Sequence, residues 1–225
     1  MGSITSSDQF LRDTILNLVL AGAGTLSAGL TWFFWLVATH PTVETKILEE
    51  IKLNLIEKQD EKGRFFNSNE VNKLVYLHAA LCETLRLYPP APINHRSSSE
   101  EDILPSGHRM KPKQRILLFF YSMGRMEDIW GEDCLEFKPE RWINSDGGGI
   151  IKVSPYKFTA FNGGPQSCLG KNMSFIEMKM VAATMLWNYR VEIMEGHPIS
   201  PTISITLYMK HGLKVRISQR DVVDH

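Results

Sequence analysis

The sequence predicts a mainly α-helical fold with small β-sheets, on three observations. Apolar residues recur at intervals of three and four over several long stretches, which is the period of an amphipathic helix. The stretches that resemble strands are short and are bounded by turn residues. Hydrophobic residues make up 43% and charged residues 22% of the 225 residues, which suffices for a core and excludes a disordered chain.

The first predicted helix covers residues 8–40. No charged side chain lies between Asp13 and His40, and residues 15–38 are long enough to cross a bilayer. Glycine, serine and threonine crowd the middle of this stretch, so composition favours a helix buried in a soluble core, with a membrane span as the alternative. Pro41 ends the helix, because proline disfavours helical geometry in the preceding residue.

Two further helices follow. Pro41 suits the first turn of a helix that runs to about residue 61. Ser68 resembles the start of another helix, over residues 68–88, whose apolar side chains share one broad face until Pro89 stops it.

The second half of the chain predicts strands, loops and one more helix. The dense apolar run 115–121 suits a buried strand. Residues 131–165 are rich in glycine and proline and are expected to be mostly loop. Helix returns over 170–189, and two short β runs, 203–209 and 213–218, are expected to pair as a hairpin.

Charge and cysteine content exclude several classes of protein. The 25 basic residues balance the 25 acidic ones, whereas a general nucleic-acid binder needs a basic surplus for phosphate contacts. The three cysteines, Cys82, Cys134 and Cys168, are an odd number without a Cys-x-x-Cys pair. That pattern excludes a disulfide framework and argues against a structural zinc site.

One cysteine stands out by its surroundings. Cys168 lies in the glycine-rich stretch 161–170, Phe-Asn-Gly-Gly-Pro-Gln-Ser-Cys-Leu-Gly, directly before a predicted helix. A helix N-terminus favours the thiolate form of a nearby thiol, and glycines let the backbone approach a sulfur atom or a flat cofactor closely. A lone cysteine is also a common small core residue, and these residues alone leave both interpretations open.

The same stretch resembles the haem-binding signature of the cytochrome P450 family, Phe-x-x-Gly-x-Arg-x-Cys-x-Gly, at Phe161, Gly164, Cys168 and Gly170. Further motifs of that family precede it in the right order: the oxygen-activation motif at 21–25, Glu-x-x-Arg at 83–86 and Pro-Glu-Arg-aromatic at 139–142. The resemblance extends over residues 8–220. The sequence around the motifs looks most like plant enzymes that hydroxylate fatty acids or long-chain alkanes.

The resemblance implies a cytochrome P450 fold and roles for residues of the loop. Cys168 would be the axial thiolate ligand to the iron of haem b. Phe161 would pack beside the ligand loop, and Gly164 and Gly170 would permit close backbone approach. Gln166 stands where the family has an arginine, so a donor for a haem propionate is kept without its positive charge.

Glu83, Arg86 and Arg141 would form a buried structural charge network in such a fold. The residues alone fit a solvated pair one helical turn apart equally well. Thr25 would sit over the distal haem face in a locally distorted helix and relay protons. As a plain helical threonine it would instead bond back to a carbonyl one turn earlier.

Arg96 would bind a haem propionate in preference to its neighbour His95, because a guanidinium grips a carboxylate with two N–H groups. A surface role is the alternative for Arg96. Gly24 is a second departure from the family pattern, which places an acid before the threonine at position 25. Without that acid, proton delivery should slow and peroxide leakage should increase.

Length is the third departure, since the chain resembles only the C-terminal half of family members. The expectation is one partial, truncated P450 domain over residues 1–225, without the N-terminal half and its membrane anchor. Its main segments would be the central helix 8–40, the Glu-x-x-Arg helix 68–88, and the ligand loop with its helix over 158–190. The apolar first helix would then lack packing partners, which predicts aggregation or membrane association.

The predicted function is a haem-dependent monooxygenase that hydroxylates long-chain alkanes or fatty acids with dioxygen. Electrons would come from NADPH-cytochrome P450 reductase, docked near Cys168 on Lys138, Lys157 and Lys171, at the cytosolic face of the endoplasmic reticulum membrane. The alternative is a truncated, catalytically impaired or inactive homologue that binds haem weakly or not at all. A small membrane protein anchored by residues 15–38 is the third hypothesis.

Overall fold

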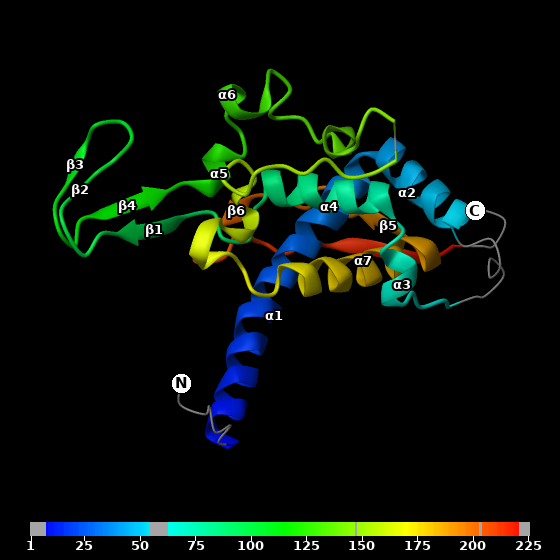
Figure 1. Ribbon diagram of the computed structural model, residues 1–225. Helices are drawn as coiled ribbons and strands as arrows, with labels where there is room; N and C mark the ends of the chain where they lie inside the picture. The colour runs from blue at the N-terminus through cyan, green and yellow to red at the C-terminus, as the bar shows by residue number, and fades with distance from the viewer. Residues whose placement is uncertain (1–7, 55–62, 147, 203, 221–225) are drawn as a thin grey trace.

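Three helices cross one another at the centre of the molecule (Figure 1). They are α1 (Asp8–Thr39), α4 (Val75–Leu87) and α7 (Lys171–Asn188) in a computed structural model that describes residues 8–54, 63–146, 148–202 and 204–220. Gly29 of α1 lies at the crossing, where a Cβ would stand 3.4 Å from Leu85 Cδ2 of α4 and 3.5 Å from Met178 Sδ of α7. Glycine at this position therefore lets α1 touch both other helices.

The remaining helical segments surround this crossing. α2 (Pro41–Asn54) packs against α4 and α7, and α3 (Ser68–Val71) packs against α7. The stretch 131–165, expected to be mostly loop, is interrupted in its described residues by short helical turns. The short turns after α4 are α5 (Phe120–Met123), α6 (Glu127–Trp130), η2 (Pro139–Trp142), η3 (Thr159–Phe161) and η4 (Gly164–Gln166).

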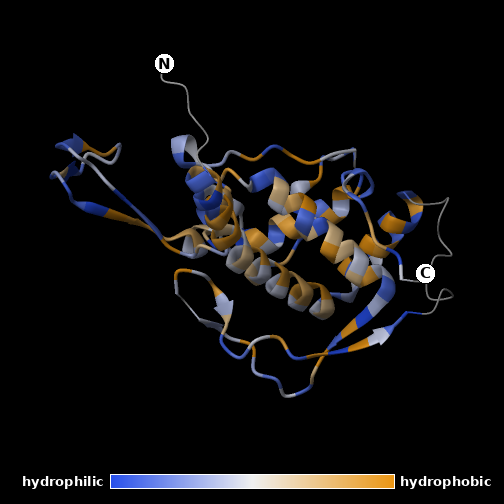
Figure 2. Cartoon of the chain, turned by 90° about the horizontal axis from the view of Figure 1, so that it is seen from below, coloured by the Kyte–Doolittle hydropathy of each residue, from blue (hydrophilic) through white to orange (hydrophobic). Residues whose placement is uncertain are grey.

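The strands pair two by two, all antiparallel. β1 (Asn94–Ser97) pairs with β4 (Arg115–Leu118), and β2 (Asp102–Ile103) with β3 (Arg109–Met110); together they form an arm that extends from the helices (Figure 1 and Figure 2). The other pairs are β5 (Tyr189–Ile193) with β8 (Val215–Gln219), and β6 (Pro201–Thr202) with β7 (Tyr208–Met209). The predicted class, mainly α with small β-sheets, is confirmed.

The hydrophobic core lies between α1, α2, α4 and α7. Its fully buried side chains include Phe33, Ile47, Leu77, Leu81 and Leu186. The helices present apolar residues to one another at the helical period, and Figure 2 shows these residues among polar ones along the packed helices. The helical pattern found in the sequence therefore corresponds to real packing for these elements.

The two halves of α1 differ in burial. Trp32 and Phe33 in the C-terminal half are 1% and 0% exposed, whereas the N-terminal half projects away from the other helices (Figure 1). Its exposed apolar residues are Phe10, Leu11, Ile15, Leu16, Leu18, Val19 and Leu20. In the described residues, α1 is the helix long and apolar enough to cross a membrane by length and composition, with 11% of its most apolar window buried. The prediction of a helix buried in a core is thus right only from Ala28 onward.

Residues 68–88 form two helices rather than the predicted one. Asn67 and Glu70 make a capping box that starts α3, and the helix ends at Val71. α4 begins afresh at Val75, where the carboxylate of Glu50 from α2 accepts hydrogen bonds from the N–H groups of Tyr76 (2.6 Å) and Leu77 (3.0 Å). A side chain from a distant helix therefore supplies the second start, which no local pattern reveals.

Three strand predictions also need correction. The run 115–121 is a half-exposed strand only to Leu118, because β4 pairs with β1 alone and the chain then turns into α5. The runs 203–209 and 213–218 do not form a hairpin, since β7 pairs with β6 and β8 with β5; residue 203 lies outside the described residues. The helix expected to residue 189 ends at Asn188, and residues 55–61 of the second predicted helix lie outside the described residues.

The residue after β8 ties three elements together. The backbone N–H of Arg220 donates to Asn188 O (2.9 Å) and its Nε–H to Leu186 O (2.9 Å), both at the end of α7. Its guanidinium also pairs with Glu44 of α2. The side chain of Asn188 in turn bonds both backbone groups of Arg64. This cluster fixes the end of the β5–β8 sheet against α2 and α7.

Candidate functional site: the cysteine loop and the buried charge network

Two charged residues of α4 are completely buried. The side chains of Glu83 and Arg86 are both 0% exposed, and Arg86 Nε and Nη2 donate to the Glu83 carboxylate over 2.7 and 2.8 Å. Arg86 also donates to the carbonyls of Gly124, Cys134 (2.6 Å) and Glu136 (2.9 Å). Of the two interpretations of the Glu-x-x-Arg spacing, the structure shows the buried network and not the solvated pair.

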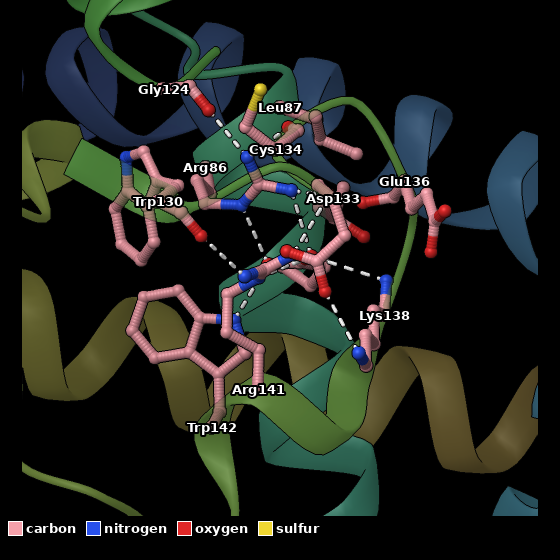
Figure 3. A network of polar contacts seen from close by, with 12 residues as sticks. Arg86, Leu87, Gly124, Trp130, Asp133, Cys134, Glu136, Lys138, Arg141 and Trp142 are labelled. Atoms are coloured by element: carbon pink, nitrogen blue, oxygen red, sulfur yellow. Dashed lines mark hydrogen bonds and ion pairs between the residues drawn. The ribbon is translucent and has the colours of Figure 1, made fainter. Parts of the chain in front are cut away.

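Residues around η2 complete the network (Figure 3). Arg141 Nε donates to Glu83 (3.2 Å) and its Nη groups to the carbonyls of Trp130 (2.8 Å) and Asp133 (2.9 Å). Trp142 donates its indole N–H to Glu83 over 2.8 Å. The sequence predicted Arg141 as a member of this network but not Trp142. The Trp142 indole N–H could have indicated it, because a buried indole N–H usually needs a hydrogen-bond acceptor.

Asp133 extends the network to the surface. Its carboxylate pairs with Lys138 (2.8 Å) and Arg141 (2.8 Å), and hydrogen bonds from Lys138 and Arg141 lower the pKa of Asp133 to about 2. The network thereby holds α4, α6 and the loop-rich segment in one arrangement. Lys138 is one of the lysines expected to contact a reductase, and in the structure it is bonded within the chain.

The loop that carries Cys168 is held by its own backbone. Cys168 N donates to Phe161 O over 2.8 Å, and both the N–H (3.1 Å) and the hydroxyl (2.7 Å) of Ser167 donate to Gly164 O. Gly164 has φ of +70°, a conformation that a side chain would strain. The loop leads into α7, whose N-cap is Gly170. The predicted place of Cys168, directly before a helix, is confirmed.

The three thiols differ in accessibility. Cys168 is exposed, whereas Cys82 and Cys134 are buried, and burial raises the pKa of the Cys82 thiol. Residues 165–169 are all exposed, and Leu169 is 94% exposed. Among the described residues, Cys168 is thus the thiol that can offer its sulfur to a ligand, and an apolar side chain lies beside it.

Aromatic side chains support the loop. The Phe161 ring packs against Phe175 of α7, with centroids 5.1 Å apart, and the Nζ of Lys171 lies 5.7 Å from the same ring. A Cβ on Gly163 would lie 3.2 Å from the ring of Tyr156. Phe161 therefore lies beside the loop, as the resemblance implied, and Tyr156 is a contact that the sequence did not indicate.

Arg96 and His95 lie on opposite faces of β1. Arg96 is half-buried and its Nη2 lies 3.4 Å from Asn162 Oδ1, which also accepts a bond from Asn94 Nδ2 (2.8 Å). His95 is exposed. The structure thus brings Arg96, and not His95, to the loop that precedes Cys168. Gln166 is exposed in η4.

Thr25 lies in α1, where the projecting half of the helix meets the packed half. Its Oγ1 donates to the carbonyl oxygens of Ala21 (2.8 Å) and Gly22 (3.2 Å). α1 runs as one continuous helix from Asp8 to Thr39, with Thr25 inside it. The threonine shows the back-bond of a helical residue, which satisfies its hydroxyl within the helix.

Comparison with known proteins shows to which protein family the chain belongs. A sequence model of the family described as cytochrome P450 matches residues 3–215. The chain belongs to the cytochrome P450 family. It is 49% identical to alkane hydroxylase MAH1 and 45% identical to cytochrome P450 86B1, both of Arabidopsis thaliana, over 96% of its own length. It is 46% identical to noroxomaritidine synthase 2 of Narcissus aff. pseudonarcissus over the same share.

The matches cover only part of these relatives. This P450 chain spans 41% of the alkane hydroxylase, 40% of cytochrome P450 86B1 and 43% of the noroxomaritidine synthase. The family assignment therefore applies to this chain of 225 residues, which contains the cysteine loop, the charge network and the helix of Thr25.

The residues of this P450 segment fit the haem-thiolate group that the family implies. A single exposed thiol suits an iron whose other ligands are porphyrin nitrogens. Leu169 offers apolar contact to a flat macrocycle, and Arg96 places a guanidinium beside the loop for an anionic edge. Within the described residues there is no group of three His, Cys, Asp or Glu side chains able to hold a metal ion. A cofactor that needs one protein ligand is the kind this site can accept.

Proposed function

We propose that this chain carries the haem-thiolate site of a monooxygenase that hydroxylates long-chain alkanes or fatty acids. The observation that supports it is the exposed Cys168, held by a backbone hydrogen bond to Phe161 in a loop at the start of α7. The other two cysteines are buried, so the site has one thiol at its disposal.

Each residue of the site has a proposed task. Haem b bound through a thiolate supplies an electron-rich iron that activates dioxygen. Cys168 Sγ would bind the iron, and the bond from its N–H to Phe161 O holds the backbone of this residue in place. Arg96 binds a propionate carboxylate, with Gln166 as a neutral donor in place of an arginine. Thr25 Oγ1 has lone pairs that can accept a hydrogen bond, and to relay a proton it would turn its own hydrogen away from Ala21 O.

The substrate class is proposed from one relative in particular. The most identical of the three relatives compared is named an alkane hydroxylase, which supports a long-chain apolar substrate. The noroxomaritidine synthase, at 46% identity, shows that identity alone does not separate substrate classes in this family. Turnover of palmitic acid and of a long-chain alkane, measured by product analysis, is the test of this assignment.

The partner and the location are part of the same proposal. NADPH-cytochrome P450 reductase would dock on the face of the cysteine loop, at the endoplasmic reticulum membrane. Lys171 is the best placed of the three expected lysines, since it packs on Phe161 of the loop. Lys157 lies over the Trp130 ring, with its Nζ 4.8 Å from the centroid, and Lys138 is paired with Asp133.

A second candidate is an impaired homologue that holds haem weakly. The observation that favours it is the uncharged Gln166, two residues before Cys168, where the family pattern has an arginine. Without that charge a haem propionate would lose an ionic contact, so the cofactor would be held less firmly.

Reconstitution with haem separates the two candidates. The reduced, carbon monoxide-treated chain should show the red-shifted Soret band of thiolate ligation. Cys168→Ser should abolish that band, whereas Cys82→Ala removes a buried thiol and should leave it. Gln166→Arg should slow haem loss, because it restores a positive charge for a propionate. If the chain shows no such band, the monooxygenase proposal is wrong and the impaired homologue remains as the candidate.

A further inference from the structure

The hydroxyl of Tyr208 lies against α1 at the residue that precedes Thr25. A Cβ built on Gly24 would stand 2.7 Å from Tyr208 Oη and 3.9 Å from Cζ. Any other residue at position 24 would have to displace this hydroxyl. The absence of a side chain on Gly24 thus leaves the space that the Tyr208 hydroxyl occupies.

Backbone bonds hold Tyr208 in that position. Leu207, fully buried, donates its N–H to Pro90 O (2.9 Å) and accepts the indole N–H of Trp32 on its carbonyl (2.9 Å). Trp32 lies on α1, seven residues beyond Thr25, which is two helical turns along the same side. Met209, the next residue of β7, is also buried. The strand that carries Tyr208 is therefore anchored to the helix that carries Thr25.

The side chain of Tyr208 is nevertheless reachable from water. It is 43% exposed. A phenol hydroxyl both donates and accepts a hydrogen bond, and bridging water can connect it to a neighbouring side chain. Tyr208 therefore combines a position against Gly24, the residue before Thr25, with access to solvent, and a proton relay needs both.

We propose that the Tyr208 hydroxyl is a proton-donating group of this site, in the place that an acidic side chain on residue 24 would otherwise take. The proposal rests on the proposed monooxygenase function. The Oη–H bond breaks as its proton passes through water to Thr25 Oγ1, while Thr25 turns its own hydroxyl hydrogen away from Ala21 O and gives it up. That hydrogen ends in the water molecule that a monooxygenase reaction releases, and Oη regains a proton from bulk water. Protons balance over the cycle, and no electron leaves the residue.

The first test needs no cofactor. Gly24→Ala should stabilise a helix by removing glycine's flexibility, but only where the new methyl group meets no obstacle. We expect the gain in melting temperature to be greater by about 2–4 °C in the Tyr208→Phe background than in the unaltered chain. Equal gains in melting temperature in both backgrounds would show that the Tyr208 hydroxyl does not lie against Gly24, and the proposal would then be wrong.

The second test uses the chain reconstituted with haem, the NADPH-dependent reductase and palmitic acid as the probe. Tyr208→Phe should raise the fraction of NADPH lost as hydrogen peroxide about threefold or more. Adding Gly24→Asp to that variant should restore coupling, which a merely structural tyrosine does not predict. Tyr189→Phe, an exposed tyrosine of β5, is the matched control and should change nothing.

The two proposals fail in distinguishable ways. Absence of the thiolate Soret band from the unaltered chain overturns the monooxygenase function, and the Tyr208 role falls with it. A normal band in Tyr208→Phe together with unchanged peroxide loss overturns the Tyr208 role alone. Failure of Gly24→Asp to restore coupling has the same meaning, provided that this double variant keeps the band.

Discussion

Glu83 has no exposed side-chain surface, yet its carboxylate accepts five hydrogen bonds. They come from Arg86 Nε and Nη2, Lys138 N, Arg141 Nε and Trp142 Nε1. A buried charge is tolerated when its oxygens are satisfied and opposite charge lies close by. Both conditions depend on residues that come together only in the folded chain. A substitution of Glu83 therefore tests whether the network as a whole stabilises the fold.

Glu83→Gln should destabilise the chain by about 3–5 kcal/mol, because the buried guanidinium of Arg86 loses its counter-charge. Urea unfolding followed by circular dichroism measures the loss. Glu132→Gln, an exposed glutamate in the neighbouring loop, should stay within about 0.5 kcal/mol of the unaltered chain. Equal effects of the two substitutions would contradict a structural role for Glu83.

At the scale of elements, α4 depends on α2 for its first turn. The N-cap residue of α4, Leu74, has no side-chain oxygen to receive the free N–H groups, and Glu50 of α2 receives two of them instead. Burial raises the pKa of Glu50 against the effect of those hydrogen bonds. The carboxylate therefore joins two helices as a cap from a different element.

Glu50→Ala should cost about 1–2 kcal/mol of unfolding free energy, the range for loss of an N-cap. Glu49→Ala is the control, since Glu49 is the exposed neighbour on the same helix. Hydrogen exchange at the amides of Tyr76 and Leu77 should accelerate in Glu50→Ala only. Unchanged exchange at these two amides would show that Glu50 is not the cap.

Elements were predictable where the signal is local. The end of α1 before Pro41 and the start of α7 after the cysteine loop follow from prolines, glycines and the helical period. The break at residues 72–74 was not predictable, because the cap of α4 comes from Glu50. The pairing of β8 with β5 was missed because the sequence suggests pairing between strands that are neighbours in the chain. β8 instead pairs with a strand more than twenty residues earlier, and β7 pairs with β6.

The same distinction holds within the site. The motif spacing placed Cys168, Glu83, Arg86 and Arg141, because each motif is a short string with fixed intervals. Tyr156 and Tyr208 lie outside those strings and reach the glycines only through tertiary contacts. Residues of this second kind become visible only when the chain is folded.

At the scale of the molecule, the projecting half of α1 is the largest departure from a closed fold. Its apolar side chains cover all sides of the helix rather than one stripe, so no single packing partner within the described chain buries them. An exposed apolar surface of this kind favours association with lipid or with itself.

The chain should bind phosphatidylcholine vesicles through this half of α1. Leu16→Glu should weaken vesicle binding roughly tenfold, the effect of losing one buried leucine side chain and burying a charge in its place. Asn17→Glu adds the same charge next to it but removes no apolar surface, so its effect should be smaller. Vesicle co-sedimentation gives both values, and equal binding by all three proteins would exclude α1 as the lipid contact.

The position of Arg220 has a consequence for how the chain is made. β5 is synthesised before β8, and until residues 215–220 follow and fold, β5 lacks its partner and the end of α7 lacks the bonds to Arg220. A nascent chain therefore exposes an open strand edge beside an incomplete helix end throughout that interval. The contacts at the end of α7 should therefore be among the last to form, when Arg220 reaches Glu44 and Asn188.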